Sequence, residues 1–197
     1  MKQISIEPMQ AGELRDAAVV AGRAMAPTPF PIAISGGRQD TKRMADVFKM
    51  FLGHFPGQVI VAKEEGHVVG VMRMVEWPRC QTTPFQGLRL MPAMITAGLP
   101  TLLRGLKGRA IWSKHDPKEP HWHLDPLAVV PDRQGQGIGS QLLKHFCNQV
   151  DKRGGAAYLE TDRPENVRLY ERFGWGVREE ATVLDMHCWF MWRPAQK

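Results

Sequence analysis

Three glycines alternate along a short loop between a strand-like apolar run and an amphipathic helical pattern. Gly135, Gly137 and Gly139 separate the run 121–130 from the helical pattern over 137–150. Glycine permits positive φ angles and lets a ligand approach the backbone closely. The first N–H groups of a helix have no partners inside it and lie at its positive end. The loop therefore predicts a phosphate-binding turn between a strand and a helix.

The spacing of these glycines excludes two common phosphate-binding motifs. A dinucleotide fingerprint, GxGxxG, would need a glycine where Ser140 stands. A nucleoside-triphosphate loop would need Lys-Ser or Lys-Thr after its last glycine, and Ile138-Gly139 does not supply it. A glycine-rich turn that binds no ligand is the remaining alternative from the loop alone.

The hydrophobic pattern predicts one α/β domain. A chain of 197 residues suits a single core. The first helix is expected to end at the prolines Pro27, Pro29 and Pro31. Strand–helix–strand–helix–strand–strand order at the end of the chain favours a mixed sheet. The pattern predicts strands over 4–6, 59–62, 68–74, 121–130, 157–161, 177–183 and 187–192, and helices over 14–25, 44–52, 137–150 and 164–173.

The pattern weakens between Trp77 and Pro120, where one or two short helices are expected within 88–106. Long irregular segments of compact domains are often lids or binding loops. We expect this segment to form the apolar wall of a small-ligand pocket, with simple core packing as the alternative. The apolar residues concerned are Trp77, Phe85, Leu88, Leu90, Met91, Met94, Ile95 and Leu99.

Charge and cysteine usage limit the partners. The net charge is +6, which favours anionic partners, but the basic residues are scattered and predict no nucleic-acid partner. Cys80, Cys147 and Cys188 lie far apart and form no disulfide framework, which indicates a reducing, cytoplasmic location. No signal-peptide-like stretch is present, and the uncharged stretch 90–103 is shorter than the roughly 20 residues that cross a bilayer, so no membrane partner is expected.

Two stretches beside the loop carry a family signature. Leu127-Ala128-Val129-Val130-Pro131 precedes Gln134-Gly135-Gln136-Gly137-Ile138-Gly139, and Leu169-Tyr170-Glu171-Arg172-Phe173-Gly174-Trp175 follows further on. Together they resemble the acetyl-CoA signature, Q/R-x-x-G-x-G/A, and the downstream helix of the GNAT family of N-acetyltransferases, over about 121–175. The resemblance implies a GNAT-like mixed, mostly antiparallel sheet flanked by helices, in one domain over 1–197.

The resemblance also implies an activity and its cofactor contacts. The expected enzyme moves an acetyl group from acetyl-CoA to a primary amine by direct attack in a ternary complex. Backbone groups of Leu127, Ala128 and Val129 would bind the pantetheine arm. Asn166 would touch the cofactor or begin a helix, because the family's usual asparagine position holds Arg163 here. The pyrophosphate would lie against Gln134, Gly135, Gln136, Gly137, Ile138, Gly139 and Ser140.

The chemistry requires an acid for the leaving thiolate and a base for the attacking amine. The resemblance places Tyr170 near the thioester sulfur, and a phenol with a reference pKa of about 10 is protonated at neutral pH. Packing is the alternative role for Tyr170. Residues two apart on a strand share a face, which brings His121, His123 and Asp125 together. We expect His123 and Asp125 to act at the amine, with Glu160 on the next strand as another candidate base.

Several alternatives stay open. His121, His123 and Asp125 have spacing that a metal site can use, although structural histidines are the plainer interpretation and no metal is expected. A non-catalytic acyl-CoA sensor on the same fold and a basic nucleic-acid-binding module are the competing functions. The expected acceptor is a small-molecule amine, with a protein amine as the alternative. A homodimer is also left open.

Overall fold

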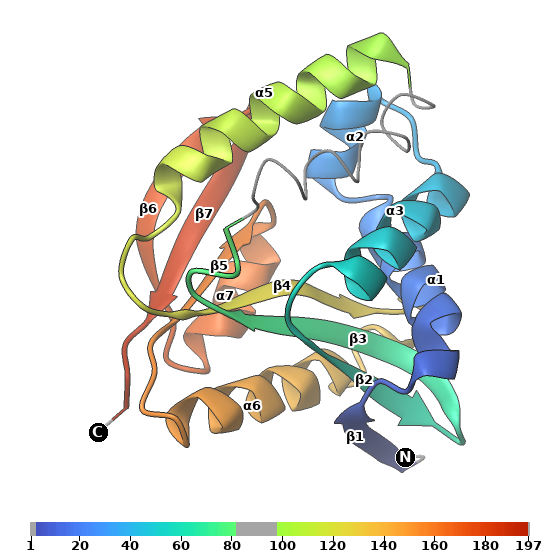
Figure 1. Cartoon of the computed structure of the whole chain (residues 1–197), viewed down its shortest axis with the longest axis vertical. Coiled ribbons are helices and arrows are strands. Elements are labelled where there is room, and N and C mark those ends of the chain that lie inside the picture. Colours follow the sequence, from blue (N-terminus) through green and yellow to red (C-terminus); the bar gives the residue numbers. More distant parts are fainter. Residues whose placement is uncertain (1–2, 82–97, 197) are drawn as a thin grey trace.

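The computed structural model describes residues 3–81 and 98–196, which form one seven-stranded sheet with helices packed against it (Figure 1). The strand order is β1-β2-β3-β4-β5-β7-β6. The strands are β1 (Ile4–Pro8), β2 (Gln58–Glu64), β3 (His67–Glu76), β4 (Trp122–Val129), β5 (Ala157–Thr161), β6 (Gly176–Val183) and β7 (Met186–Arg193). The helices are η1 (Ala11–Glu13), α1 (Leu14–Met25), α2 (Pro29–Ser35), α3 (Thr41–His54), α5 (Leu99–His115), η2 (Pro131–Arg133), α6 (Ile138–Asp151) and α7 (Pro164–Glu171).

The sheet is split between its two central strands. All neighbouring strands pair antiparallel except β4 and β5, which are parallel. Among the described residues, these two strands pair only through Trp122 with Ala157 and His123 with Tyr158. Beyond His123 they diverge, as Figure 1 shows. The edge of β4 that faces β5 is therefore open from Leu124 to Val129. The predicted mixed, mostly antiparallel sheet is confirmed.

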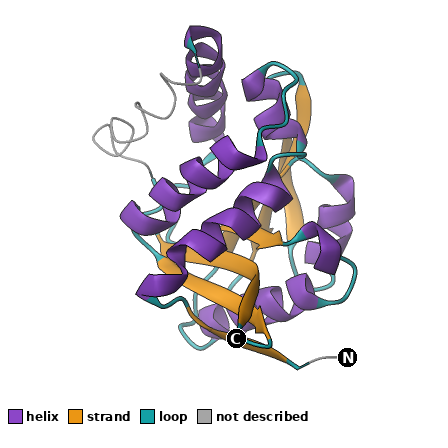
Figure 2. Cartoon of the chain, turned by 90° about the vertical axis from the view of Figure 1, so that its right-hand side faces the viewer, coloured by secondary structure: helices purple, strands orange, loops and turns teal. Residues whose placement is uncertain are grey.

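Helices cover both faces of the sheet, as the two views in Figures 1 and 2 show. The side chains of β3 are buried over seven consecutive residues, which explains why this strand is almost continuously apolar. On one face, α1 and α3 approach so closely that a Cβ at Gly22 would lie 2.6 Å from the backbone nitrogen of Ala45. On the other face, Leu142 and Ile138 of α6 pack against Gly70 of β3. The resulting main core fixes the position of α6 beneath β4.

Two helices depart from the expectations. Pro29 and Pro31 follow the end of α1 as predicted, but they also begin α2, because the first turn of a helix tolerates proline. The helix α5 runs to His115, well beyond the short helices expected within 88–106. The expected apolar wall from Phe85 to Ile95 lies outside the described residues, and Leu99 is 65% exposed.

No single helix of the described chain has both the length and the apolar character to cross a membrane. Taken together, Ala11–Met25 and Pro29–Ser35 have that length and composition, but the pair is bent by 86°.

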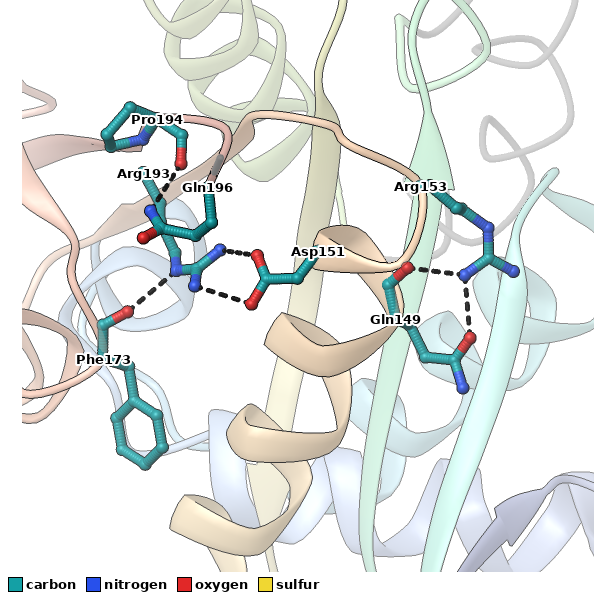
Figure 3. Close-up of polar contacts among 7 residues, drawn as sticks. All are labelled: Gln149, Asp151, Arg153, Phe173, Arg193, Pro194 and Gln196. Atoms are coloured by element: carbon teal, nitrogen blue, oxygen red, sulfur yellow. Dashed lines mark hydrogen bonds and ion pairs between the residues drawn. The ribbon is translucent and has the colours of Figure 1, made fainter.

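A buried arginine joins three elements at the closed end of the split (Figure 3). Arg193, 6% exposed at the end of β7, donates to both carboxylate oxygens of Asp151 at 2.5 and 2.9 Å. Its Nε also donates to the carbonyl of Phe173 at 2.8 Å. Two-point binding of a carboxylate fixes both orientation and distance. The ends of α6, α7 and β7 are therefore held together beside the residues where β4 and β5 still pair.

Candidate active site

The glycine loop forms an open turn between β4 and α6. Gly135 has a φ of 73° and Gly137 a φ of 81°, so both need the left-handed conformation that glycine adopts without strain. Gly137 directly precedes the first residue of α6. A Cβ built on either glycine would meet no atom within 4 Å. The turn thus presents helix N–H groups to open space, as a phosphate site requires.

Several side chains of the loop bond to nearby groups of the protein and so fix the conformation of the loop. The amide of Gln134 donates to the carbonyl of Val129 at 2.9 Å, and the amide of Gln136 donates to Asp132 at 3.3 Å. Arg133 pairs with Glu64 at 2.9 Å. Ile138 is buried in the main core. The loop therefore offers a ligand mainly its backbone groups, in a conformation already fixed by these contacts.

The three residues expected along the pantetheine arm lie on β4 with one edge already paired. Leu127, Ala128 and Val129 are opposite Met72, Val71 and Gly70 of β3. Their other edge faces the gap between β4 and β5. An extended ligand in this gap could bond to β4 in the way an added strand does.

A bulge changes the expected alternation of β4. Met74 pairs with Leu124 and Met72 pairs with Leu127, so two residues, Asp125 and Pro126, stand opposite Arg73 alone. The buried guanidinium of Arg73 donates to the carbonyl of Asp125 at 3.1 Å. The regular alternation that would place His121, His123 and Asp125 on one face of the strand is therefore interrupted at Asp125.

His123 and Glu160 form the central polar pair of the site. His123 Nε2 lies 2.8 Å from Glu160 Oε2, and their side chains are only 12% and 15% exposed. Burial alone would lower the pKa of His123, but Glu160, Cys80 and Asp125 together outweigh burial and raise that pKa well above 6.5. Burial conversely would raise the pKa of Glu160, and His123 lowers it instead. The two groups thus form an ion pair at neutral pH.

Two further carboxyl groups lie near this pair. Burial raises the pKa of Asp125, against the opposing charges of His123 and Arg73. Burial and then the charge of Glu160 raise the pKa of Asp116, which follows α5. A carboxyl group with a raised pKa is a better proton acceptor than an ordinary one. The sequence analysis missed Asp116, because it lies in the region without a clear pattern.

Cys80 joins the site from the turn that follows β3. Its Sγ lies 3.6 Å from Nε2 of the buried His121, whose Nδ1 lies 2.7 Å from the carbonyl of Glu119. Burial would raise the pKa of the Cys80 thiol, but hydrogen bonds with His121 and His123 lower it to about 7. No sequence motif connects Cys80 with histidines some forty residues later, so sequence reasoning could not find this contact.

Tyr170 lies on α7 and is 6% exposed, with its ring 6.0 Å from that of Trp175. Burial, followed by the charges of Asp162 and Asp125, raises its pKa above the usual 10. The phenol therefore stays protonated at neutral and mildly alkaline pH. Because the charge of Asp125 contributes to this rise, Tyr170 on α7 lies close enough to the bulge of β4 to interact with it electrostatically.

Asn166 makes a local contact at the start of α7. Its side-chain amide donates to Oγ1 of Thr161 at 3.2 Å. This bond joins the first turn of α7 to the end of β5 and fits the helix-start role. Contact of Asn166 with a cofactor stays a prediction.

The fold and the loop agree with what comparison with known proteins finds. The sequence model of the Acetyltransferase (GNAT) family matches residues 26–175. The chain therefore belongs to the GNAT acetyltransferase family.

Solved structures share the fold at low sequence identity. A histone acetyltransferase HPA2 and related acetyltransferase from Corynebacterium glutamicum has a TM-score of 0.67 at 20% identity, over 100% of this chain and 98% of that one. A GNAT family acetyltransferase from Brucella melitensis in complex with acetyl-CoA has a TM-score of 0.56 at 17% identity, over 100% and 93%. These likenesses show the fold.

A curated relative matches more closely but over a short stretch. The [ribosomal protein bS18]-alanine N-acetyltransferase of Escherichia coli is 40% identical over 60 residues, which is 29% of this chain and 38% of that protein. The match thus spans less than two fifths of the length of this relative.

Proposed function

We propose that the protein transfers an acetyl group from acetyl-CoA to a primary amine of a small molecule. The observation that carries this proposal is the open edge of β4, which runs from the glycine loop to His123. The loop suits the pyrophosphate of the cofactor, and the edge suits its extended arm. The acetyl thioester would then reach the gap beside the ion pair of His123 and Glu160.

Each part of the cofactor has assigned partners. Backbone groups of Leu127, Ala128 and Val129 bind the pantetheine arm. The amide of Asn166 lies at the end of β5, across the same gap, and is assigned to the arm as well. The pyrophosphate is bound by Gln134, Gly135, Gln136, Gly137, Ile138, Gly139 and Ser140, chiefly through their backbone.

The transfer proceeds by direct attack. The neutral amine attacks the thioester carbonyl, a C–N bond forms and the C–S bond breaks. Asp125, and His123 in the neutral form that it takes above its raised pKa, accept the proton that the amine releases, and Tyr170 protonates the leaving thiolate. Holding both substrates in one complex supplies a large part of the rate. Acetyl transfer in this scheme requires no metal.

The electrostatics and shape of the site support a small amine. Three partly buried carboxyl groups, Asp116, Asp125 and Glu160, lie close enough to interact and supply hydrogen-bond acceptors for an amine. A pocket of about 630 Å³ lies where β4 begins and just before β5 begins, and Trp77, His121 and Trp122 are among its lining residues. That volume falls in the range of small-molecule sites.

A panel of acceptors tests the proposal. The similarity to the bS18-alanine acetyltransferase favours a second candidate, the terminal amine of a protein. Release of CoA thiol is measured with small primary amines and with short peptides that begin with alanine. We expect at least one small amine to exceed every peptide in kcat/KM. Faster peptides would favour the protein acceptor, and turnover with neither class would favour an acyl-CoA sensor.

The ion pair of His123 and Glu160 should set the pH at which kcat/KM falls on the acidic side of the pH–rate profile. Because the base must be neutral and Glu160 raises the pKa of His123, kcat/KM should rise with pH along a limb centred above pH 6.5. Glu160→Gln removes the charge that raises this pKa, so the limb should move to lower pH. Profiles of both proteins with one amine measure the shift. A limb that stays in place in Glu160→Gln would remove His123 from the base role.

A further inference from the structure

Cys80, His121 and His123 bring three metal-binding atoms together beside the proposed transfer site. The sulfur and one ring nitrogen of each histidine all lie within 4.8 Å of one another. His121 is buried, the side chain of His123 is 12% exposed, and Cys80 is partly buried. The spacing of the sequence suggested Asp125 as the third ligand of such a site, but the fold brings Cys80 to the histidines instead.

The distances suit a tetrahedral ion. With Zn–S of about 2.3 Å and Zn–N of about 2.05 Å, tetrahedral coordination separates sulfur and nitrogen by about 3.6 Å. Sγ of Cys80 lies 3.6 Å from Nε2 of His121. The pair can therefore hold an ion between its atoms with little movement of either side chain.

The hydrogen bond that one ring nitrogen of each histidine makes to a neighbouring group also suits a metal site. A carbonyl only accepts hydrogen bonds, so Nδ1 of His121 must donate to Glu119, which leaves the lone pair of Nε2 directed at Cys80. Glu160 holds the ring of His123 through Nε2. Histidine ligands typically have their second ring nitrogen bonded to a carbonyl or carboxylate, and this site has one of each.

We propose that Cys80, His121 and His123 form a Zn²⁺ site with one open coordination position. Thiolate and imidazole ligands together select zinc among the common divalent ions. On binding, Zn²⁺ displaces the thiol proton of Cys80 and one ring proton of the charged His123, both of which are released to solvent, and no electron is transferred. The occupied site would also bind a lone pair of His123 and so withhold it from the amine. Three protein ligands leave the fourth position open, unlike the closed four-ligand sites in which zinc is structural.

Metal titration of the full chain tests this site without any acetyl transfer. The metal-free protein is titrated with Co²⁺, whose tetrahedral d–d bands and thiolate charge-transfer band report the ligand set, and with Zn²⁺ by calorimetry. We expect one ion per chain and the spectrum of a tetrahedral site with one thiolate. Absence of stoichiometric binding, or an octahedral spectrum without a thiolate band, would overturn the proposal.

Two variants and a protection experiment identify the ligand. Cys80→Ser should weaken Zn²⁺ binding by about 100-fold or more, since changes around a metal's ligands alone cost roughly 10–100-fold. Cys147→Ala removes a buried thiol elsewhere and should bind Zn²⁺ as the parent does. In the unaltered protein, Zn²⁺ should slow alkylation of Cys80 by iodoacetamide, read by peptide mass spectrometry. Equal affinity in Cys80→Ser, or equal alkylation with and without Zn²⁺, would show that Cys80 is not a ligand.

Discussion

Replacing Gly137 with valine is expected to weaken acetyl-CoA binding by about 100-fold or more. Gly137 has a φ of 81°, and forcing a residue with a Cβ into that conformation costs roughly 1–2 kcal/mol. The new side chain would also occupy the open space in front of the loop, where no protein atom lies within 4 Å. Calorimetry with acetyl-CoA measures the loss.

Gly66 supplies a matched control for this substitution. It has a φ of 83° in the turn between β2 and β3, and a Cβ there would also meet nothing within 4 Å. Gly66→Val should therefore lower the melting temperature as Gly137→Val does, while acetyl-CoA affinity stays close to that of the parent. Equal affinity in the parent and in Gly137→Val would refute the loop as the cofactor site.

Tyr170→Phe is expected to lower kcat by about 10²–10⁴-fold, the usual contribution of a general acid or base. Removing one hydroxyl leaves the ring and its packing against Trp175 in place. On the proposed function, however, the leaving thiolate loses the group that protonates it. Steady-state kinetics should show a much smaller change in KM for acetyl-CoA than in kcat.

The other tyrosine gives the comparison that assigns this role. The hydroxyl of Tyr158 is buried and has no hydrogen-bond partner among the described residues. Tyr158→Phe removes the same atom from a buried ring and should leave kcat within a few-fold of the parent. If Tyr158→Phe loses more activity than Tyr170→Phe, the acid is Tyr158. If neither variant loses activity, both phenols only pack.

The part of the fold around the proposed cofactor site could be predicted from local signals. Alternating glycines between an apolar run and an amphipathic helix were enough to predict the turn before α6. The positive φ angles of Gly135 and Gly137 confirm that turn. Apolar spacing likewise sufficed for α1, α3 and α6, because each buries one continuous face in the core. The split of the sheet lay beyond such signals and was not predicted.

Residues that depend on contacts distant in sequence were missed. Cys80 and Asp116 lie near the two ends of the region without a clear pattern, and only the fold brings them to His123. The strand period placed Asp125 on the face of His121 and His123, but a bulge that includes Pro126 shifts the register there. Prolines ended α1 as expected, yet the same residues began α2, since proline both stops one helix and suits the start of the next.

The open edge of β4 links the stability of the protein to the supply of its substrate. Backbone groups on that edge need hydrogen-bond partners, which water supplies until an extended ligand enters the gap. A cofactor that binds the folded chain alone raises the free energy of unfolding by about 2.7 kcal/mol at a concentration 100 times its Kd. On the proposed function, falling acetyl-CoA would therefore slow the reaction and also expose more of the enzyme to unfolding and proteolysis.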